Sequence, residues 1–378
     1  MSGSYKAAGV NIELGDIVSE MLYEAAKQTW VNREGKLGEV VELFPDFSGL
    51  RAVHVGGLPQ GTYMNLGFDG VGTKVEIAER TGHHDTVAYD LFAMVCDDAV
   101  VRGAEPIMIG SILDVNSLGP DDEPYINQVK ELATGYVNAA REANVAVVNG
   151  EIAELGARIS GYGNFRYNWG AACLWIACRD RMLTGNEIQV GDSLVGLREY
   201  GLRSNGLSLI RKTFEDRYGP EWHLVDDIID GQTETLGDLV LTPSKIYTKA
   251  VVDMLGGVFG EPKADIHGVA HITGGGVPGK VGRMLKPSGL GADIEAPFEP
   301  SEIMKHCQNI AEIIDAEAYK TWNMGQGMVI ATPEPFEVIS VAQEHDIDAD
   351  EIGQVTEKSG IRIRSNGVFR AGQWLDFE

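Results

Sequence analysis

The spacing of hydrophobic residues along the chain predicts helices and strands that alternate. Residues 86–102 and 123–143 carry apolar side chains three and four positions apart, which is the period of an amphipathic helix. Residues 107–113 and 169–178 are short and almost wholly apolar, as in strands covered on both faces. A helical segment is also expected within residues 5–35, and strands near 52–55 and 63–66.

The pattern breaks near residues 179–192, where charged and turn-forming residues replace the apolar runs. Beyond the break we expect strands at 193–198, 327–331 and 352–356, and helices at 206–216, 243–256, 277–285, 301–314 and 335–345. Both halves therefore mix helices with strands, which indicates an α+β or α/β fold and not a bundle or a sandwich. A length of 378 residues fits two domains, and we predict them at 1–185 and 186–378.

Composition and charge narrow the possible partners. The chain carries 31 Lys+Arg against 56 Asp+Glu, a formal net charge of −25, which disfavours nonspecific binding to nucleic acid or anionic lipid. The apolar run at 169–178 is about half of the ~20 residues that a membrane-spanning helix needs, and no signal peptide is evident. The four cysteines form no Cys-x-x-Cys pair, which fits a reducing compartment. We expect a cytoplasmic protein that binds neither nucleic acid nor membrane.

A first candidate site is the segment Asp69-Gly70-Val71-Gly72-Thr73-Lys74, which follows an expected strand. Its carboxylate is a hard oxygen ligand suited to Mg²⁺, and the ammonium of Lys74 is a point charge suited to phosphate. The segment is not a P-loop, because the pattern G-x-x-x-x-G-K-[ST] is absent. An ordinary tight turn after a strand is the alternative interpretation.

Three carboxylates lie on the expected helix at 86–102: Asp90, Asp97 and Asp98. At 3.6 residues per turn, Asp97 projects within roughly 20° of Asp90, whereas Asp98 lies about 80° away. Their neighbours are almost all apolar, so a cation or an internal partner must neutralise any carboxylate that is buried there. Either at least one of them binds metal and phosphate, or Asp97 and Asp98 face solvent.

Three later motifs are weaker candidates. Glu151 follows a buried strand, where catalytic groups often lie, and Ser204-Asn205-Gly206 opens a helix whose N–H groups suit an anion. Thr273-Gly274-Gly275-Gly276 also precedes a helix and can form a backbone cradle for phosphate, or else a flexible hinge. His267 and His271 have the spacing of a zinc pair, but no third ligand is near them in the sequence, so we do not expect zinc.

Taken together and in order, these segments resemble the phosphoribosylformylglycinamidine cyclo-ligase family, also called aminoimidazole ribonucleotide synthetases. Each motif is weak alone, but they follow one another in register over nearly the whole chain. The matching segments are 4–10, 69–74, 84–86, 90–91, 93–94, 98, 103–106, 150–151, 153–154, 204–206, 208–209, 241–243, 246–247, 270–276 and 321–325.

The resemblance implies an ATP-dependent ring closure of formylglycinamidine ribonucleotide to aminoimidazole ribonucleotide, through a phosphorylated amide. It implies a homodimer in which the N-terminal sheet pairs with a second subunit, with ATP near the interface, and a C-terminal α/β domain. Asp69, Lys74 and His271 would be catalytic, and Asp69, Asp98 and Glu151 would bind Mg²⁺. The residues implied to bind ATP are Asp69, Gly70, Gly72, Thr73, Lys74, Asp90, Asp98 and Glu151. Those implied to bind the ribonucleotide are Arg203, Ser204, Asn205, Gly206, Thr273, Gly274, Gly275 and Gly276.

The chain departs from the family pattern at several of these positions. The glycine-rich stretch that usually precedes the first strands reads Leu-Gly-Glu-Val-Val-Glu-Leu at 37–43. Ile152 replaces a usual Thr, Arg203 a usual His, and Gly279-Lys280 a usual Glu-Asn, while Asp97 replaces a usual Asn. Arg203 and Lys280 both add positive charge where an anionic substrate would lie. We expect Arg203 to bind an oxygen anion of that substrate.

Two other functions stay open at the level of the sequence. One is a different ATP-using enzyme of the same superfamily, such as a selenide or thiamine-phosphate kinase. The other is a noncatalytic nucleotide-binding paralogue.

Overall fold

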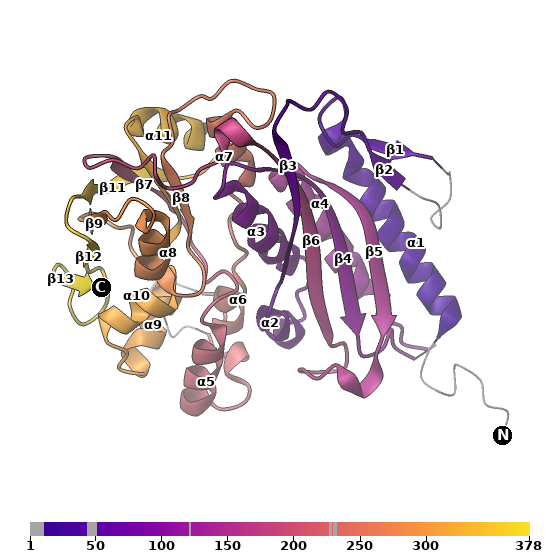
Figure 1. The fold of residues 1–378 in the computed structure, drawn as a ribbon. Helices are drawn as coiled ribbons and strands as arrows, with labels where there is room; N and C mark the ends of the chain where they lie inside the picture. The colour runs from indigo at the N-terminus through magenta and orange to yellow at the C-terminus, as the bar shows by residue number, and fades with distance from the viewer. Residues whose placement is uncertain (1–10, 44–50, 121, 227–228, 230–232) are drawn as a thin grey trace.

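The structure is a computed structural model that describes residues 11–43, 51–120, 122–226, 229 and 233–378. It consists of two sheet-containing halves that lie side by side (Figure 1). The segment 4–10, which contributes to the resemblance, falls outside the described residues.

The first half is a four-stranded sheet in the order β3-β6-β4-β5, with β4 and β5 parallel and the other pairs antiparallel. A small two-stranded sheet, β1-β2, lies beside it. The elements of this half are α1 (Ile12–Gln28), β1 (Val40–Glu42), β2 (Arg51–Val53), β3 (Thr62–Gly70), α2 (Lys74–Thr81), α3 (Val87–Val100), β4 (Glu105–Val115), α4 (Ile126–Ala143), β5 (Ala146–Glu154) and β6 (Tyr167–Cys178).

One face of this sheet is covered by helices and the other is open. The hydroxyl of Tyr136 on α4 donates to Ser111 of β4 at 2.7 Å, which identifies the covered face. Side chains alternate along a strand, so Ile112 points to the opposite face, where it is 56% exposed. Phe68 is 74% exposed and lies on the same open face. It pairs with Ala172 of β6, which pairs with Gly110 of β4, two residues from Ile112.

The second half is a seven-stranded sheet in the order β13-β12-β9-β11-β7-β10-β8, antiparallel except for the pair β9-β12. Its strands are β7 (Ser193–Arg198), β8 (Gly268–His271), β9 (Gly291–Ile294), β10 (Gln326–Thr332), β11 (Ala349–Thr356), β12 (Gly360–Arg364) and β13 (Trp374–Phe377). Its helices are α5 (Leu207–Tyr218), α6 (Leu236–Leu241), α7 (Thr248–Leu255), α8 (Gly276–Leu285), α9 (Glu302–Ile310), α10 (Asp315–Thr321) and α11 (Pro335–Glu344). The expected α+β character of both halves is confirmed.

The two halves share a buried core, and α3 is its central element. The residues of α3 from Leu91 to Cys96 are all buried, and the helix contacts α7 and β8 of the second half as well as its own sheet. α3 therefore fixes where the loops of the second half lie relative to the ends of β3 and β6.

Candidate functional site

The first group of charged residues is an ion pair that joins the halves. The ammonium of Lys74 lies 2.8 Å from Oδ1 of Asp90 and donates to the carbonyl of Thr242 at 2.6 Å. The hydroxyl of Ser244 donates to the same Asp90 oxygen at 2.5 Å. Lys74 and Asp90 are both fully buried. Their position therefore favours a structural role and leaves the ammonium of Lys74 inaccessible to a phosphate.

Asp97, two turns further along α3, makes a second connection of this kind. Its Oδ1 accepts bonds from the backbone N–H of Tyr247 and the hydroxyl of Thr248, at 3.0 and 2.8 Å. Both donors lie where α7 begins, so the carboxylate also meets the positive end of that helix. Its Oδ2 accepts a bond from Arg203 at 3.0 Å. Asp97 is fully buried, so it does not face solvent.

Asp98 points away from this interior, as its different projection on the helix predicts. It is 54% exposed, and its Oδ1 lies 2.7 Å from Nδ1 of His271, at the end of β8. Burial raises the pKa of Asp98, but the hydrogen bond and charge of His271, with Lys280 and Arg203, outweigh it and lower the pKa overall. Asp98 is thus held as a carboxylate at the junction of the halves.

Asp69, at the end of β3, joins Asp98 there. Burial is the main cause that raises the pKa of Asp69, against a hydrogen bond from Gly70, and the charge of Asp98 raises it further. Burial and Arg283 lower the pKa of Lys280 on α8, while Asp98 and Asp69 oppose that shift. The charges of Asp69, Asp98 and Lys280 thus influence one another at this junction.

The loops around this cluster come from both halves. Exposed Gly72 adopts a φ of 70°, and a Cβ there would lie 3.9 Å from the carbonyl of Ser204. A Cβ on Gly274 would lie equally close to the side-chain amide of Asn205. The structure therefore brings together the turn at 70–73, the loop before α5 at 204–206 and the glycine loop at 273–276. Thr73 is exposed beside Gly72 and makes no side-chain bond at the start of α2.

Among the described residues, the buried polar atoms without a partner include the hydroxyl of Ser204 and the amide oxygen of Asn205, both at this junction. They precede Gly206, which begins α5 with a φ of 74°. Such atoms cost free energy unless a ligand or water satisfies them. The pattern is typical of a site prepared to bind a polar molecule.

The glycine loop opens α8 and is partly accessible. Gly274 and Gly275 are exposed, whereas Thr273 and Gly276 are buried. A Cβ on Gly276 would collide with the carbonyl of Tyr319, so this close contact requires a glycine. Gly274 and Gly275 directly precede α8, and the N-terminus of a helix suits an anion.

Glu151 does not lie with the other expected metal ligands. In the register, Asp69 aligns with Ser111 on the covered face, whereas Glu151 aligns with Ile112 on the open face. Two strands separate β3 from β5, which places the two residues about 14 Å apart. Among the described residues, no group of three or more His, Cys, Asp or Glu side chains lies close enough to hold a metal ion.

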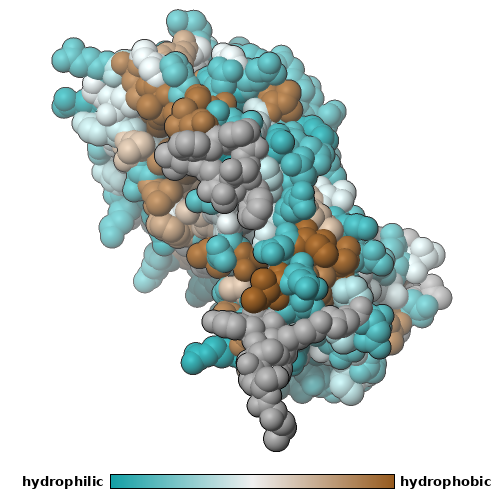
Figure 2. All heavy atoms as spheres, turned by 90° about the vertical axis from the view of Figure 1, so that its right-hand side faces the viewer, coloured by the Kyte–Doolittle hydropathy of each residue, from teal (hydrophilic) through white to brown (hydrophobic). Residues whose placement is uncertain are grey.

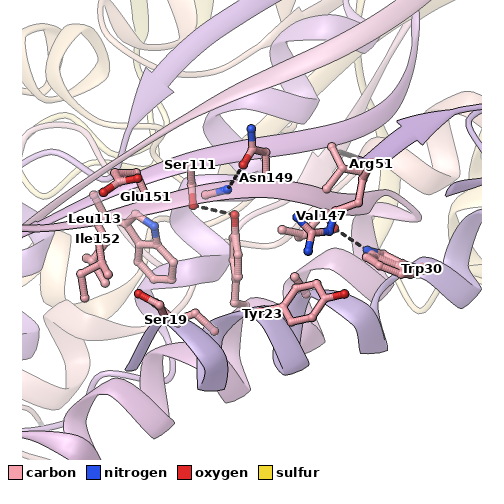
Figure 3. A pocket seen from close by; sticks show the side chains of 16 residues that line it. Ser19, Tyr23, Trp30, Arg51, Ser111, Leu113, Val147, Asn149, Glu151 and Ile152 are labelled. Atoms are coloured by element: carbon pink, nitrogen blue, oxygen red, sulfur yellow. Dashed lines mark hydrogen bonds between the residues drawn. The ribbon is translucent and has the colours of Figure 1, made fainter. Parts of the chain in front are cut away.

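Glu151 instead lines two hollows. One is a depression of about 600 Å³ on the open face of the sheet, with Phe68 and Ile112. The other is a cavity of about 270 Å³ beneath α1, seen in Figure 3 with Tyr23, Trp30 and Ser111 around it.

Sequence reasoning missed Glu199, which completes the buried network. Its Oε2 lies 2.8 Å from Arg203, and its Oε1 accepts bonds from the backbone N–H groups of Tyr200 and Gly201. The spacing of four residues between Glu199 and Arg203 was a signal for an ion pair, although they lie outside a helix. Arg203 does bind oxygen anions, but in this structure they belong to the chain itself.

Comparison with known proteins supplies the family. Residues 51–175 match the model of the AIR synthase related protein N-terminal domain, and residues 189–366 match that of its C-terminal domain. A phosphoribosylformylglycinamidine cyclo-ligase from Bacillus mycoides is 33% identical over 96% of this chain and 98% of its own. One from Geotalea uraniireducens is 34% identical over 88% of each chain. The chain belongs to the phosphoribosylformylglycinamidine cyclo-ligase family.

Solved structures agree with the fold of this cyclo-ligase family member. Escherichia coli HypE superposes with a TM-score of 0.61 at 17% identity, over 96% of this chain and 97% of that chain. Thermotoga maritima PurL, solved with ADP, gives a TM-score of 0.51 at 14% identity, over 85% of this chain and 44% of that chain. At such identities the likeness extends to the fold alone. Within the described part of the chain, no helix is long and apolar enough to cross a membrane.

Proposed function

We propose that the protein is an ATP-dependent cyclo-ligase that converts formylglycinamidine ribonucleotide into aminoimidazole ribonucleotide. ATP phosphorylates the formyl-amide oxygen, an amidine nitrogen attacks the activated carbon, and phosphate leaves. The observation that carries this proposal is the junction, where Asp98 of the first half bonds to His271, two residues before the glycine loop of the second half, and where Gly72 approaches Ser204. Reactions of this class need positioning and charge neutralisation more than covalent help from the protein.

Asp69 and Asp98 are the residues that we assign to Mg²⁺–ATP. They offer hard carboxylate oxygens, both are exposed, and two such ligands suit an ion that takes its other ligands from phosphates and water. When bound, Mg²⁺ would neutralise charge on the transferred phosphoryl group. Gly70, Gly72 and Thr73 would approach the phosphates from the turn after β3. Lys280 would supply the ammonium beside the phosphates, because the ammonium of Lys74 is buried against Asp90.

The second half would hold the ribonucleotide. Ser204 and Asn205 offer unpartnered polar atoms, and Gly206 lets the chain turn into α5. The exposed backbone of Gly274 and Gly275 at the start of α8 would bind its phosphate. This division assigns ATP to residues 1–185 and the ribonucleotide to residues 186–378.

We further propose a homodimer built on the open face of the first sheet. Met64, Leu66, Phe68 and Ile112 are all exposed there, at 66%, 43%, 74% and 56%. Figure 2, which views the side of the molecule that carries α1, shows hydrophobic residues gathered on that side as well. Glu151 lies on the open face, too far from Asp69 to share a metal within one chain, so it could join the nucleotide only across such an interface. The role of Glu151 as a metal ligand therefore depends on this dimer. We also assign the enzyme to the cytoplasm.

The decisive experiment is an ADP-release assay with purified protein, ATP, Mg²⁺ and formylglycinamidine ribonucleotide. We expect ADP release that depends on the ribonucleotide and formation of aminoimidazole ribonucleotide in equal amount. Asp98→Asn should lose this activity, whereas Asp216→Asn, on the surface of α5, should keep it. ADP release without ring closure would favour a kinase of the same superfamily. ATP binding without turnover would favour the noncatalytic paralogue.

A further inference from the structure

Arg203 lies at the centre of a fully buried polar network. Its Nη1 donates to Glu199 and to the carbonyl of Lys245, at 2.8 and 2.9 Å. Its Nη2 donates to Asp97 at 3.0 Å and lies 2.7 Å from Nε2 of His271. Burial by itself lowers the pKa of Arg203, but the two carboxylates outweigh it and raise the pKa, so the side chain stays charged.

The hydrogen-bond chemistry of these groups fixes the tautomer of His271. A guanidinium group can only donate hydrogen bonds, so Nε2 of His271 must accept the bond from Arg203. The ring proton then resides on Nδ1, which donates to Asp98 at 2.7 Å. The imidazole is thus held at both nitrogens, and only 1% of its side chain is exposed.

This arrangement changes what His271 can do in the reaction. An imidazole whose Nε2 is occupied by Arg203 and whose Nδ1–H is occupied by Asp98 has no nitrogen left for substrate. Of the three side chains in the series Arg203–His271–Asp98, only the carboxylate reaches the accessible junction. His271 therefore serves to orient Asp98.

We infer that Arg203 is a positioning residue, which fixes His271 as its Nδ1–H tautomer and thereby holds Asp98 in the orientation that receives Mg²⁺–ATP. The identity of the ligand, Mg²⁺–ATP, rests on the proposed function, whereas the geometry of Arg203, His271 and Asp98 does not. Arg203 balances the buried charges of Asp97 and Glu199 and still has a donor left for His271.

The test combines a spectroscopic measurement with a binding measurement. In the wild-type protein, the hydrogen-bonded Nδ1–H of His271 should give one sharp NMR signal, assigned by its absence in His271→Gln. Arg203→Ala should lose or broaden that signal. It should also bind Mg²⁺ with a non-hydrolysable ATP analogue roughly 10–100-fold more weakly, as for other groups that orient a metal ligand.

Two further variants separate positioning from support of the fold. Arg203→Lys keeps the charge beside Glu199 and Asp97 but lacks the planar fork, so it should fold and still lose the signal. Glu199→Gln disturbs the same network without touching the bond to His271, so it should lower the melting temperature and keep the signal. A wild-type signal in Arg203→Lys, or equal loss in Glu199→Gln, would overturn the inference. The signal does not depend on turnover, so a protein without cyclo-ligase activity would still test it.

Discussion

Asp90 and Asp97 lie two turns apart on one face of α3, and each binds a different end of the segment 242–248 from the other half of the molecule. Asp90 accepts a bond from Ser244, and Asp97 accepts bonds from Tyr247 and Thr248. Each carboxylate is paired with a buried cation, Lys74 or Arg203. The two buried ion pairs join the halves next to the candidate site, so we expect their loss to lower the free energy of unfolding first.

Asp90→Asn should destabilise the protein strongly, because it leaves the ammonium of Lys74 buried without a counter-charge. Breaking one partner of a buried pair typically costs about 3–5 kcal/mol. Urea unfolding followed by circular dichroism measures this loss. The double variant Lys74→Met/Asp90→Leu should recover much of it, because no charge is then left unpaired. Asp216→Asn, which breaks an exposed pair with Lys212, is the control and should cost less than about 1 kcal/mol. Equal midpoints for Asp90→Asn and this control would contradict the assignment.

Asp69→Asn and Asp98→Asn should have the opposite profile. Both side chains are exposed at the junction, so the fold should persist while a hard oxygen ligand is lost. Titration calorimetry with Mg²⁺–ATP should show weaker binding by about tenfold or more in each variant, with melting temperatures close to wild type. Glu357→Gln, at an exposed position in the second half, is the matched control. Unchanged affinity in both aspartate variants would remove these residues from the nucleotide site.

The elements predicted correctly from the sequence are those with a long local pattern. The helix at 86–102 and the strand at 169–178 appear as α3 and β6 because their periodicity is decided by their own residues. The helix expected at 243–256 begins only at Thr248, because the preceding residues are held by bonds to Lys74, Asp90 and Asp97. Strands of four or five residues, such as β8, β9 and β12, are too short to show a period.

The site was predictable in its members more than in their roles. The helical period placed Asp90 and Asp97 on one face and Asp98 on another, and the structure agrees. It could not say which face is covered, because the covering segments lie more than 100 residues away in sequence. In the same way, the sequence indicated that Arg203 binds an anion. It did not indicate which one, because its partner Asp97 lies 106 residues earlier in the chain.

The proposed dimer makes a prediction about the open sheet face. Light scattering should return twice the 40.9 kDa mass of one chain. Ile112→Asp should shift the protein toward the monomer, because a charge would replace an apolar contact in the centre of the interface. Phe336→Asp is the control, since Phe336 is 80% exposed on α11 in the other half. A wild-type mass of one chain at every concentration would rule the dimer out, and Glu151 could then not serve the nucleotide site.

The last prediction concerns Glu79 on α2, close to the turn that carries Gly72 and Thr73. Its two carboxylate oxygens accept bonds from the backbone N–H groups of Tyr162 and Tyr167, at 2.8 and 2.9 Å. Burial raises the pKa of Glu79 from its ordinary value of 4.5 to about 7, with these hydrogen bonds opposing and the charge of Glu76 adding to the rise. The folded protein therefore holds a proton on Glu79 that the unfolded chain gives up above pH 4.5.

The sign of the pH dependence follows from this difference. The stability that the protonated group contributes is fully present below pH 4.5 and is lost as the pH rises through 7. Glu79→Gln has no such proton to lose, so its free energy of unfolding should rise relative to wild type by up to about 3 kcal/mol between pH 4.5 and 7.5. Urea unfolding of both proteins at half-unit pH steps measures the change. The comparison uses the slope with pH, because glutamine also forfeits one acceptor for Tyr162 or Tyr167 and so lowers stability at every pH. If the two curves stay parallel across this range, Glu79 titrates alike in the folded and unfolded protein, and burial does not govern its charge.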